Sequence, residues 1–291
     1  MELRPSERKK AKIKMALQGS AGAGKSLSAL LLAKGLTNDQ LHKVAVIDTE
    51  NGSSDLYAHI GNYNVLNLQP PYTPEKYCEA IDICIAANME VIIVDSISQC
   101  WDELIDFHSR LPGNSFTNWN KVTPRHKAFV DKILQSPAHF IATMRTKQDY
   151  VLNQKDGKYV PEKVGLKAVQ RDGVEYEFTL VFDIDSKHFA IASKDRTNLF
   201  NGKPEFMISA STGKKILDWC NAPTLQEDVL KRINECLSVS DLMKLFKEFP
   251  DYQKSLNAQF QGKKQELENL VSPKNYSQNG ISTSNAQTGQ Q

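Results

Sequence analysis

An eight-residue pattern near the start of the chain limits its fold more than any other feature. Residues 19–26 read GSAGAGKS and match G-x-x-x-x-G-K-[ST] from Gly19 to Ser26. This pattern forms a phosphate-binding loop when it follows a strand and begins a helix. Both conditions are expected here, because residues 12–19 alternate apolar and polar side chains and residues 27–32 carry leucines at helical spacing. The alternative is a glycine- and alanine-rich turn that matches by chance.

The residue types in this loop suit an anionic ligand. Glycines let main-chain N–H groups turn inward around a phosphate, and the helix N-terminus adds a partial positive charge. Lys25 is expected to reach the β- and γ-phosphates, and Ser26 to bind Mg²⁺. The residues expected to bind the nucleotide are Gly19, Ser20, Ala21, Gly22, Ala23, Gly24, Lys25 and Ser26.

Short apolar runs alternate with helical patterns after this loop. The runs expected to form strands are residues 43–48, 90–95, 139–144, 177–185 and 188–193. Helical patterns cover residues 26–36, where Gly35 is the expected stop, and residues 74–87 and 124–135. The alternation predicts an α/β fold with a mostly parallel sheet flanked by helices. No long helix separates the last two runs, which predicts an antiparallel edge.

The chain is expected to divide into three segments. Residues 1–221 form the α/β core, and residues 226–270 form a small helical module with apolar side chains at helical spacing. Residues 271–291 are rich in Ser, Asn and Gln and almost uncharged, so we expect a disordered tail.

Composition excludes several classes of protein. The formal net charge is only +2, so any attraction to nucleic acid must be local. The five cysteines include no C-x-x-C pair, which argues against a zinc site or a disulfide framework and favours reduced thiols in a cytoplasm. There is neither an apolar signal core nor a run of about 18 apolar residues, so no membrane association is expected.

Three acidic residues follow expected strands and can complete the site. Asp95 ends an apolar run, where an acid can hold the water shell of Mg²⁺ together with Ser26. Asp48 ends the run 43–48 and Glu50 lies two residues beyond it, and a carboxylate there can orient a water for attack on the γ-phosphate. The alternatives are an Asp95 that caps a turn and a solvated acid pair before the turn at 51–52.

The order of these segments resembles the RecA-like recombinases, over residues 13–208. VIDTEN resembles the strand end whose glutamate activates water, which implies that role for Glu50. Tyr57 matches a tyrosine that stacks on adenine, and IIVDSIS resembles the strand with the magnesium aspartate, here Asp95. The overall pattern is similar to the phage-encoded RecA-like P-loop ATPases, often labelled phage nucleotide-binding proteins. The resemblance implies ATP and Mg²⁺ as cofactors.

The same resemblance implies contacts between subunits. SKDRTNLFNGKPEFMI, residues 193–208, resembles the segment whose basic pair reaches a neighbour's γ-phosphate, which implies that role for Lys194 and Arg196 in a homo-oligomer. The alternative is a solvated basic turn. HFIATMRTK resembles the strand that leads into the second DNA-binding loop, and Thr143, Arg145 and Gln148 are candidates for the family's γ-phosphate sensor near it. RecA's N-terminal polymerisation helix has no counterpart in the dozen residues before the first strand, which leaves a ring or assembly on DNA as alternatives to a filament.

Two segments are candidates for contact with single-stranded DNA. Residues 145–172 carry seven basic and four acidic residues, a net charge of +3, with Tyr150 and Tyr159 between the lysines. Proteins bind single strands with positive charges that follow the phosphate backbone and aromatic rings on which the bases stack. A β-hairpin with a D-G turn is the alternative and is compatible with DNA contact. Residues 101–125 are expected to form a second irregular insertion, which offers Phe116, Trp119 and Lys121.

These features favour an Mg-ATP-hydrolysing ATPase that binds single-stranded DNA in phage recombination, annealing or repair, together with other phage replication proteins in the host cytoplasm. One alternative is a small-molecule or nucleotide kinase in which residues 145–172 form a lid. The other is a scaffold that binds DNA under the control of a nucleotide that it hardly hydrolyses.

Overall fold

The computed structural model describes residues 12–155, 158–222 and 225–271. The chain divides into two compact units, residues 1–222 and 223–291. The strands are β1 (Lys14–Gly19), β2 (Val44–Asp48), β3 (Asn64–Asn67), β4 (Val91–Asp95), β5 (His139–Lys155), β6 (Lys158–Ala168), β7 (Leu180–Ile184), β8 (Phe189–Asp195) and β9 (Phe206–Met207). The α-helices are α1 (Lys25–Leu36), α2 (Pro74–Ala86), α3 (Ser98–Arg110), α4 (Ser115–Gln135), α5 (Ala210–Asn221), α6 (Leu225–Glu235), α7 (Val239–Glu248) and α8 (Asn257–Val271). The 3₁₀ helices are η2 (Leu41–Lys43), η3 (Ser53–Ile60), η4 (Val174–Glu177) and η5 (Pro250–Tyr252).

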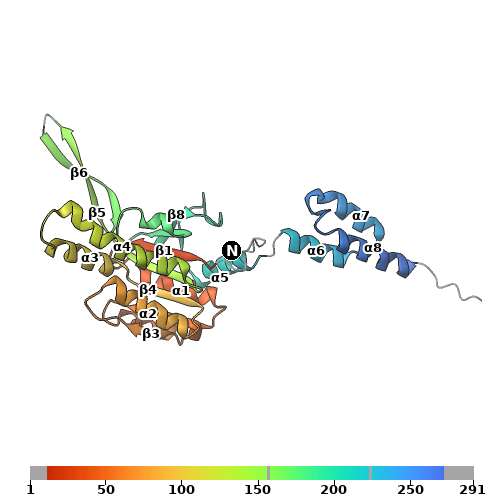
Figure 1. Cartoon of the computed structure of the whole chain (residues 1–291), viewed down its shortest axis with the longest axis horizontal. Coiled ribbons are helices and arrows are strands. Elements are labelled where there is room, and N and C mark those ends of the chain that lie inside the picture. Colours follow the sequence, from red (N-terminus) through yellow and green to blue (C-terminus); the bar gives the residue numbers. More distant parts are fainter. Residues whose placement is uncertain (1–11, 156–157, 223–224, 272–291) are drawn as a thin grey trace, which may run out of the picture. The chain divides into compact units, whose positions relative to one another are not determined.

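The first unit is built on a mostly parallel sheet (Figure 1). Within the described ranges, nine strands form it in the order β3-β2-β4-β5-β1-β7-β8-β9, with β6 paired to β5 outside this path. Each pair of adjacent strands along the path from β3 to β7 is parallel, whereas β8 is antiparallel to β7 and to β9, and β6 is antiparallel to β5. The predicted α/β class and its antiparallel edge are therefore confirmed. Strand β1 lies between β5 and β7, so the loop after Gly19 leaves from the middle of the sheet.

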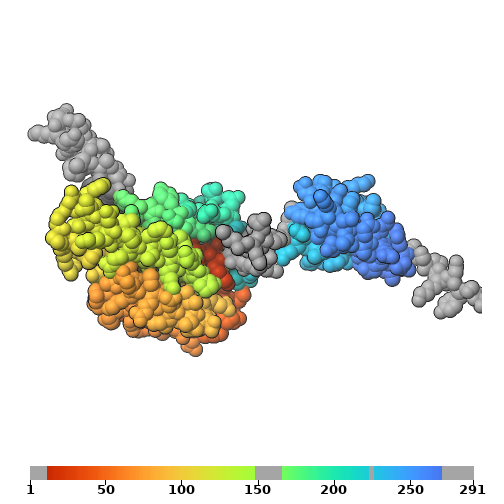
Figure 2. Space-filling model, in the orientation of Figure 1, coloured from red at the N-terminus to blue at the C-terminus, as the bar shows by residue number. Residues whose placement is uncertain are grey.

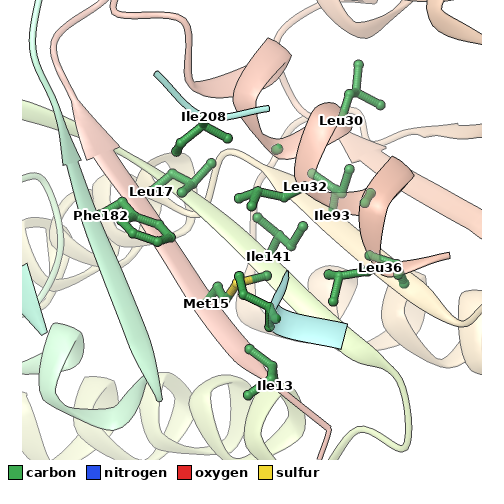
Figure 3. Packing of buried hydrophobic residues seen from close by; sticks show 14 of the residues in the cluster. Ile13, Met15, Leu17, Leu30, Leu32, Leu36, Ile93, Ile141, Phe182 and Ile208 are labelled. Carbon is green, nitrogen blue, oxygen red and sulfur yellow. The ribbon is translucent and has the colours of Figure 1, made fainter. Parts of the chain in front are cut away.

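Alternate residues of the central strands face two separate cores. Met15 and Leu17 of β1 pack with helix α1 on one face, where α5 also lies (Figure 3). Ala16, between them, belongs to the core that α2, α3 and α4 cover. Helix α4 contacts both α2 and α3, and Figure 2 shows the orange segment that contains α2 beside the yellow to yellow-green segment of α3 and α4. Because both faces are buried, the strands need the continuous apolar runs that the sequence shows.

Helices α1 and α5 pack closely through glycines. A Cβ on Gly213 would lie 2.1 Å from the main-chain O of Leu32, and a Cβ on Gly35 would lie 2.0 Å from that of Ala210. Gly35 is therefore inside the helix, which ends at Leu36. The expectation that Gly35 stops this helix was wrong, because the residue serves helix packing and not the C-terminal turn.

The expectation of an irregular insertion at residues 101–125 was wrong, because helices α3 and α4 cover this segment except for residues 111–114. Helix α3 continues to Arg110, and α4 begins at Ser115 and contains Pro124 in its interior. Trp119 stacks on the ring of His108 across the two helices, with ring centroids 4.3 Å apart. Phe116 is exposed at the first turn of α4.

Residues 145–172 contain a β-hairpin, as the alternative interpretation holds. The pairing of β5 with β6 runs from Thr146 opposite Ala168 to Lys155 opposite Lys158. The two strands extend beyond the sheet as an arm (Figure 1). The D-G turn at residues 156–157 lies outside the described residues.

The remaining expectations concern the run 177–185 and the C-terminal part of the chain. The run 177–185 was expected to be one strand, but η4 occupies residues 174–177 and β7 begins only at Leu180. In the second unit, helices α6, α7 and α8 enclose a small core of their own that includes Val229, Leu245 and Phe260. Residues 272–291 of the expected tail lie outside the described residues. In the part of the chain that the structure describes, no helix is both long and apolar enough to cross a bilayer.

Candidate nucleotide-binding site

The loop between β1 and α1 has the strand–loop–helix context that a phosphate loop requires. Gly24 is the N-cap of α1 with φ of 87°, in the left-handed region that favours glycine. Lys25 is only 8% exposed, and its Nζ donates to the main-chain O of Gly19 at 3.0 Å and of Ser20 at 2.8 Å. Burial lowers the pKa of Lys25, and the neighbouring carboxylates of Asp95 and Glu50 oppose that shift.

Asp95 lies at the end of β4 beside the phosphate loop. It is 2% exposed, and burial raises the pKa of its carboxyl, while hydrogen bonds from Ser26 and Thr143 act in the opposite direction. The Thr143 hydroxyl donates to Asp95 Oδ1. A hydroxyl and a carboxylate are hard oxygen ligands that suit Mg²⁺, which usually keeps several waters and binds substrate phosphates. Since the described residues contain no cluster of three metal-binding side chains, a Mg²⁺ here would depend on Ser26, Asp95 and the nucleotide.

Asp48 organises the loop that follows β2 and does not face the pocket as a free acid. Its Oδ1 accepts from the main-chain N of Glu50 at 2.6 Å, and its Oδ2 accepts from the N of Ser54 at 2.9 Å and from the Ser54 hydroxyl. Thr49 ties the same loop to β4, since its N donates to the main-chain O of Asp95 at 2.9 Å. The loop therefore holds Glu50 at a defined place beside the end of β4.

The side chain of Glu50 is bound by Arg145. Arg145 Nε and Nη2 lie 3.1 and 2.8 Å from Glu50 Oε1, so neither contact uses Oε2. When the amide of Gln99 is oriented to satisfy both of its ends, its oxygen accepts from Arg145 Nη2 at 3.0 Å. Arg145 is the last residue of β5 paired to β1, opposite Gly19, so the base of the arm meets the phosphate loop here.

The phosphate loop and the side chains of Glu50, Asp95 and Arg145 line one pocket of about 490 Å³, a volume within the usual range for small-molecule sites. Loop residues 21–28, except Ala23, form one wall, and Glu50, Asp95 and Arg145 contribute the polar groups. Tyr57, on η3, and Met207 contribute apolar surface. Sequence reasoning did not identify His188 and Met207, because no local pattern marks them and only the tertiary fold brings them to this loop.

Some expected site residues lie elsewhere. Lys194 pairs with Val181 in the antiparallel β8, at the end of β7 remote from the phosphate loop. Its Nζ donates to the main-chain O of Tyr176, and Arg196 is exposed one position beyond β8. Neither lines the pocket. The side chain of Gln148, a sensor candidate, lies outside the described residues.

Comparison with known proteins gives a family and a distant structure. A family model described as AAA domain matches residues 11–216, more than half of the chain. A solved KaiC-like protein from the hyperthermophilic archaeon Pyrococcus horikoshii is similar with 16% sequence identity and a TM-score of 0.38, covering 67% of this chain and 82% of that one. No curated protein matches the sequence.

Proposed function

Since the chain belongs to the AAA domain family of P-loop ATPases, we propose that it binds Mg-ATP in this pocket and hydrolyses the γ-phosphate. One observation carries the proposal. Lys25, Ser26, Asp95 and Glu50 come from three separate segments and line the same pocket at the carboxyl ends of β1, β2 and β4. Ligands of open α/β sheets bind at this edge.

The chain's own residues suit in-line attack by water on the γ-phosphate. Main-chain N–H groups of the loop hold the phosphates, and Lys25 leaves its loop carbonyls to meet the β- and γ-oxygens. Bound Mg²⁺, held by Ser26 and Asp95, would neutralise charge on the same oxygens. Glu50 accepts a proton from the attacking water, and Arg145 holds its carboxylate through Oε1, which leaves Oε2 for that transfer.

A neighbouring subunit is part of the proposal. Lys194 and Arg196 are remote from the pocket of their own chain, so we propose that they act on the nucleotide of another copy. Cations there would stabilise charge that develops on the transferred phosphoryl group. We therefore place the complete active site between two copies in a homo-oligomer.

Single-stranded DNA is the proposed partner of the arm. The sequence gives residues 145–172 a net charge of +3 with two tyrosines, and β5 and β6 extend this segment away from the sheet. Arg145 connects the base of the arm to Glu50, which gives a path from DNA contact to hydrolysis. This activity would serve recombination, annealing or repair of phage DNA with other phage proteins.

Two measurements test the proposal. Lys25→Ala should abolish binding of ADP in calorimetry, because the phosphates lose the cation of the loop. ATP turnover should rise when single-stranded DNA is added. If the rate of ATP turnover is independent of DNA but requires a small acceptor molecule, the protein is a kinase. If the protein binds DNA but shows no hydrolysis in a single-turnover assay, it is a scaffold.

The contributions of the arm's basic side chains and of its tyrosine ring to DNA binding can be tested separately. Neutralising Lys155, Lys158 and Lys163 should reduce the salt dependence of binding by about 0.7 in log K per decade of salt for each phosphate that the arm no longer binds. Tyr159→Ala should weaken binding by about 1–3 kcal/mol with little change in that slope. Unchanged affinity and slope in the charge variant would exclude the arm as the DNA site.

A further inference from the structure

His188 contacts the phosphate loop from the turn between β7 and β8. Its ring Nδ1 lies 3.0 Å from the main-chain O of Ala23. A carbonyl oxygen can only accept a hydrogen bond, so Nδ1 carries the proton and donates. The ring also lines the nucleotide pocket, and a Cβ on Gly24 would lie 3.1 Å from its Nδ1. The contact therefore joins the connection between β7 and β8 to the Ala23–Gly24 peptide, just before the N-cap of helix α1.

The turn is built to present this side chain. Oδ1 of Asp185 accepts from the main-chain N of Lys187 at 2.9 Å and of Phe189 at 2.8 Å. His188 itself has φ of 71°, in the left-handed region that is uncommon for residues other than glycine. Such a conformation is retained only when its surroundings determine it, and it is often associated with a functional position.

The hydrogen bond fixes the plane of one peptide of the phosphate loop. In a trans peptide the C=O and the following N–H point in opposite directions. With the oxygen of Ala23 held by His188, the N–H of Gly24 points away from that ring. Glycine at position 24 has little resistance of its own to rotation of this peptide, so an external contact is needed to hold one orientation.

We propose that His188 is a positioning residue of the nucleotide site, which holds the Ala23–Gly24 peptide with the Gly24 N–H directed at the nucleotide phosphates. The inference rests on the proposed nucleotide binding and adds a residue to it. Main-chain N–H groups of such a loop hold the α- and β-phosphates. His188 therefore contributes to the affinity for ADP and ATP but takes no part in hydrolysis of the γ-phosphate.

Two substitutions at this position separate the hydrogen bond from the shape of the turn. His188→Gly and His188→Asn both tolerate a positive φ, but only asparagine keeps a donor, with Nδ2 as many bonds from the main chain as histidine Nδ1. His188→Gly should weaken ADP binding roughly tenfold in calorimetry, because one hydrogen bond to a charged group is partly lost. His188→Asn should restore most of that affinity. Lys187→Ala, on an exposed side chain of the same turn, is the matched control and should bind ADP normally.

The phosphate dependence is the decisive readout. Adenosine has no phosphate, so its dissociation constant should be the same for all four proteins when it is obtained by competition with a fluorescent nucleotide whose own affinity is measured for each protein. Equal ADP affinity in the glycine variant, the asparagine variant and the unchanged protein would overturn the inference. Equal losses in both variants, with lower thermal stability, would overturn it too, because the residue would then serve only the turn. Failure of the unchanged protein to bind ADP would instead reject the proposed function along with the inference.

Discussion

Replacing Asp48 by asparagine should cost the core about 3 kcal/mol of stability, whereas replacing Glu50 by glutamine should cost less than about 1 kcal/mol. Asp48 is 2% exposed and accepts three hydrogen bonds, one from Glu50 and two from Ser54, which is itself 1% exposed. An amide has one acceptor oxygen, so its NH₂ must face the main-chain N–H of Glu50 if the oxygen keeps the two contacts with Ser54. One charge-assisted bond, worth about 1.5–3 kcal/mol, is removed, and the other two become weaker.

The expected loss of stability is smaller when Glu50 is replaced. Its side chain is 30% exposed and pairs with an Arg145 side chain that is 43% exposed, and pairs of this kind contribute about 0–1 kcal/mol. Asp48→Asn should also reduce ATP turnover, because the N–H of Glu50 loses the acceptor that fixes the loop. Asp48 is thus expected to position the base, and Glu50 to be the base.

Thermal and urea unfolding of the full chain measure the difference. For a domain of this size, about 3 kcal/mol corresponds to a decrease in Tm of roughly 6–12 °C. Glu50→Gln is the matched control, since it makes the same change from carboxylate to amide two residues away. An Asp48→Asn protein as stable as the unchanged protein, or a Glu50→Gln protein that is the less stable of the two, would refute the assignment of roles.

The core and the proposed oligomer lead to three further predictions. Burial lowers the pKa of His139 from 6.5 to about 3, so the unfolded chain takes up a proton between these values that the folded chain does not. Stability should therefore fall by up to about 4–5 kcal/mol as pH decreases from 6.5 to 3, and His139→Asn should lack this part of the acid dependence in urea unfolding. Gly213→Ala should lower stability by about 1–3 kcal/mol, because the new Cβ would lie 2.1 Å from the main-chain O of Leu32 and α1 and α5 must separate; an unchanged Tm would contradict this packing. Mixing Lys25→Ala with Arg196→Ala protein should restore part of the ATP turnover through mixed interfaces, and a turnover independent of concentration without rescue would indicate a monomeric enzyme.

The sequence predicted the sheet and the phosphate loop because both have strong local signals. The runs before Asp48 and Asp95 are apolar at every position, as strands buried on both faces must be, and the loop pattern has fixed spacing. Helix α3 and the part of α4 before Pro124 were missed for a local reason as well, whereas the helical pattern at residues 124–135 was predicted. Residues 112–114 resemble a loop, and Pro124 resembles a helix start, but the packing of α4 against α2 and α3 outweighs the cost of an internal proline.

The arrangement of the site depended on contacts that no spacing reveals. The resemblance to the RecA-like recombinases implied the role of Glu50, but no sequence pattern gave Asp48 a separate role, which only its hydrogen bonds to Ser54 reveal. Arg145 was a candidate sensor, but its pairing with Glu50 arises where β5 leaves β1, 95 residues along the chain from the glutamate. His188 had no signal at all, because its partner is a main-chain oxygen 165 residues away.

Single-turnover hydrolysis of ATP by Glu50→Gln, compared with the unchanged protein at saturating nucleotide and Mg²⁺, is the most direct test of the proposed chemistry. We expect the variant to bind ATP with nearly unchanged affinity and to hydrolyse it on the order of 10²–10⁴-fold more slowly, because an amide cannot accept the proton of the attacking water. Lys25→Ala serves as the control that loses binding itself. Hydrolysis by Glu50→Gln at the normal rate would contradict the assignment of Glu50 as the base and, with it, the mechanism proposed for this pocket.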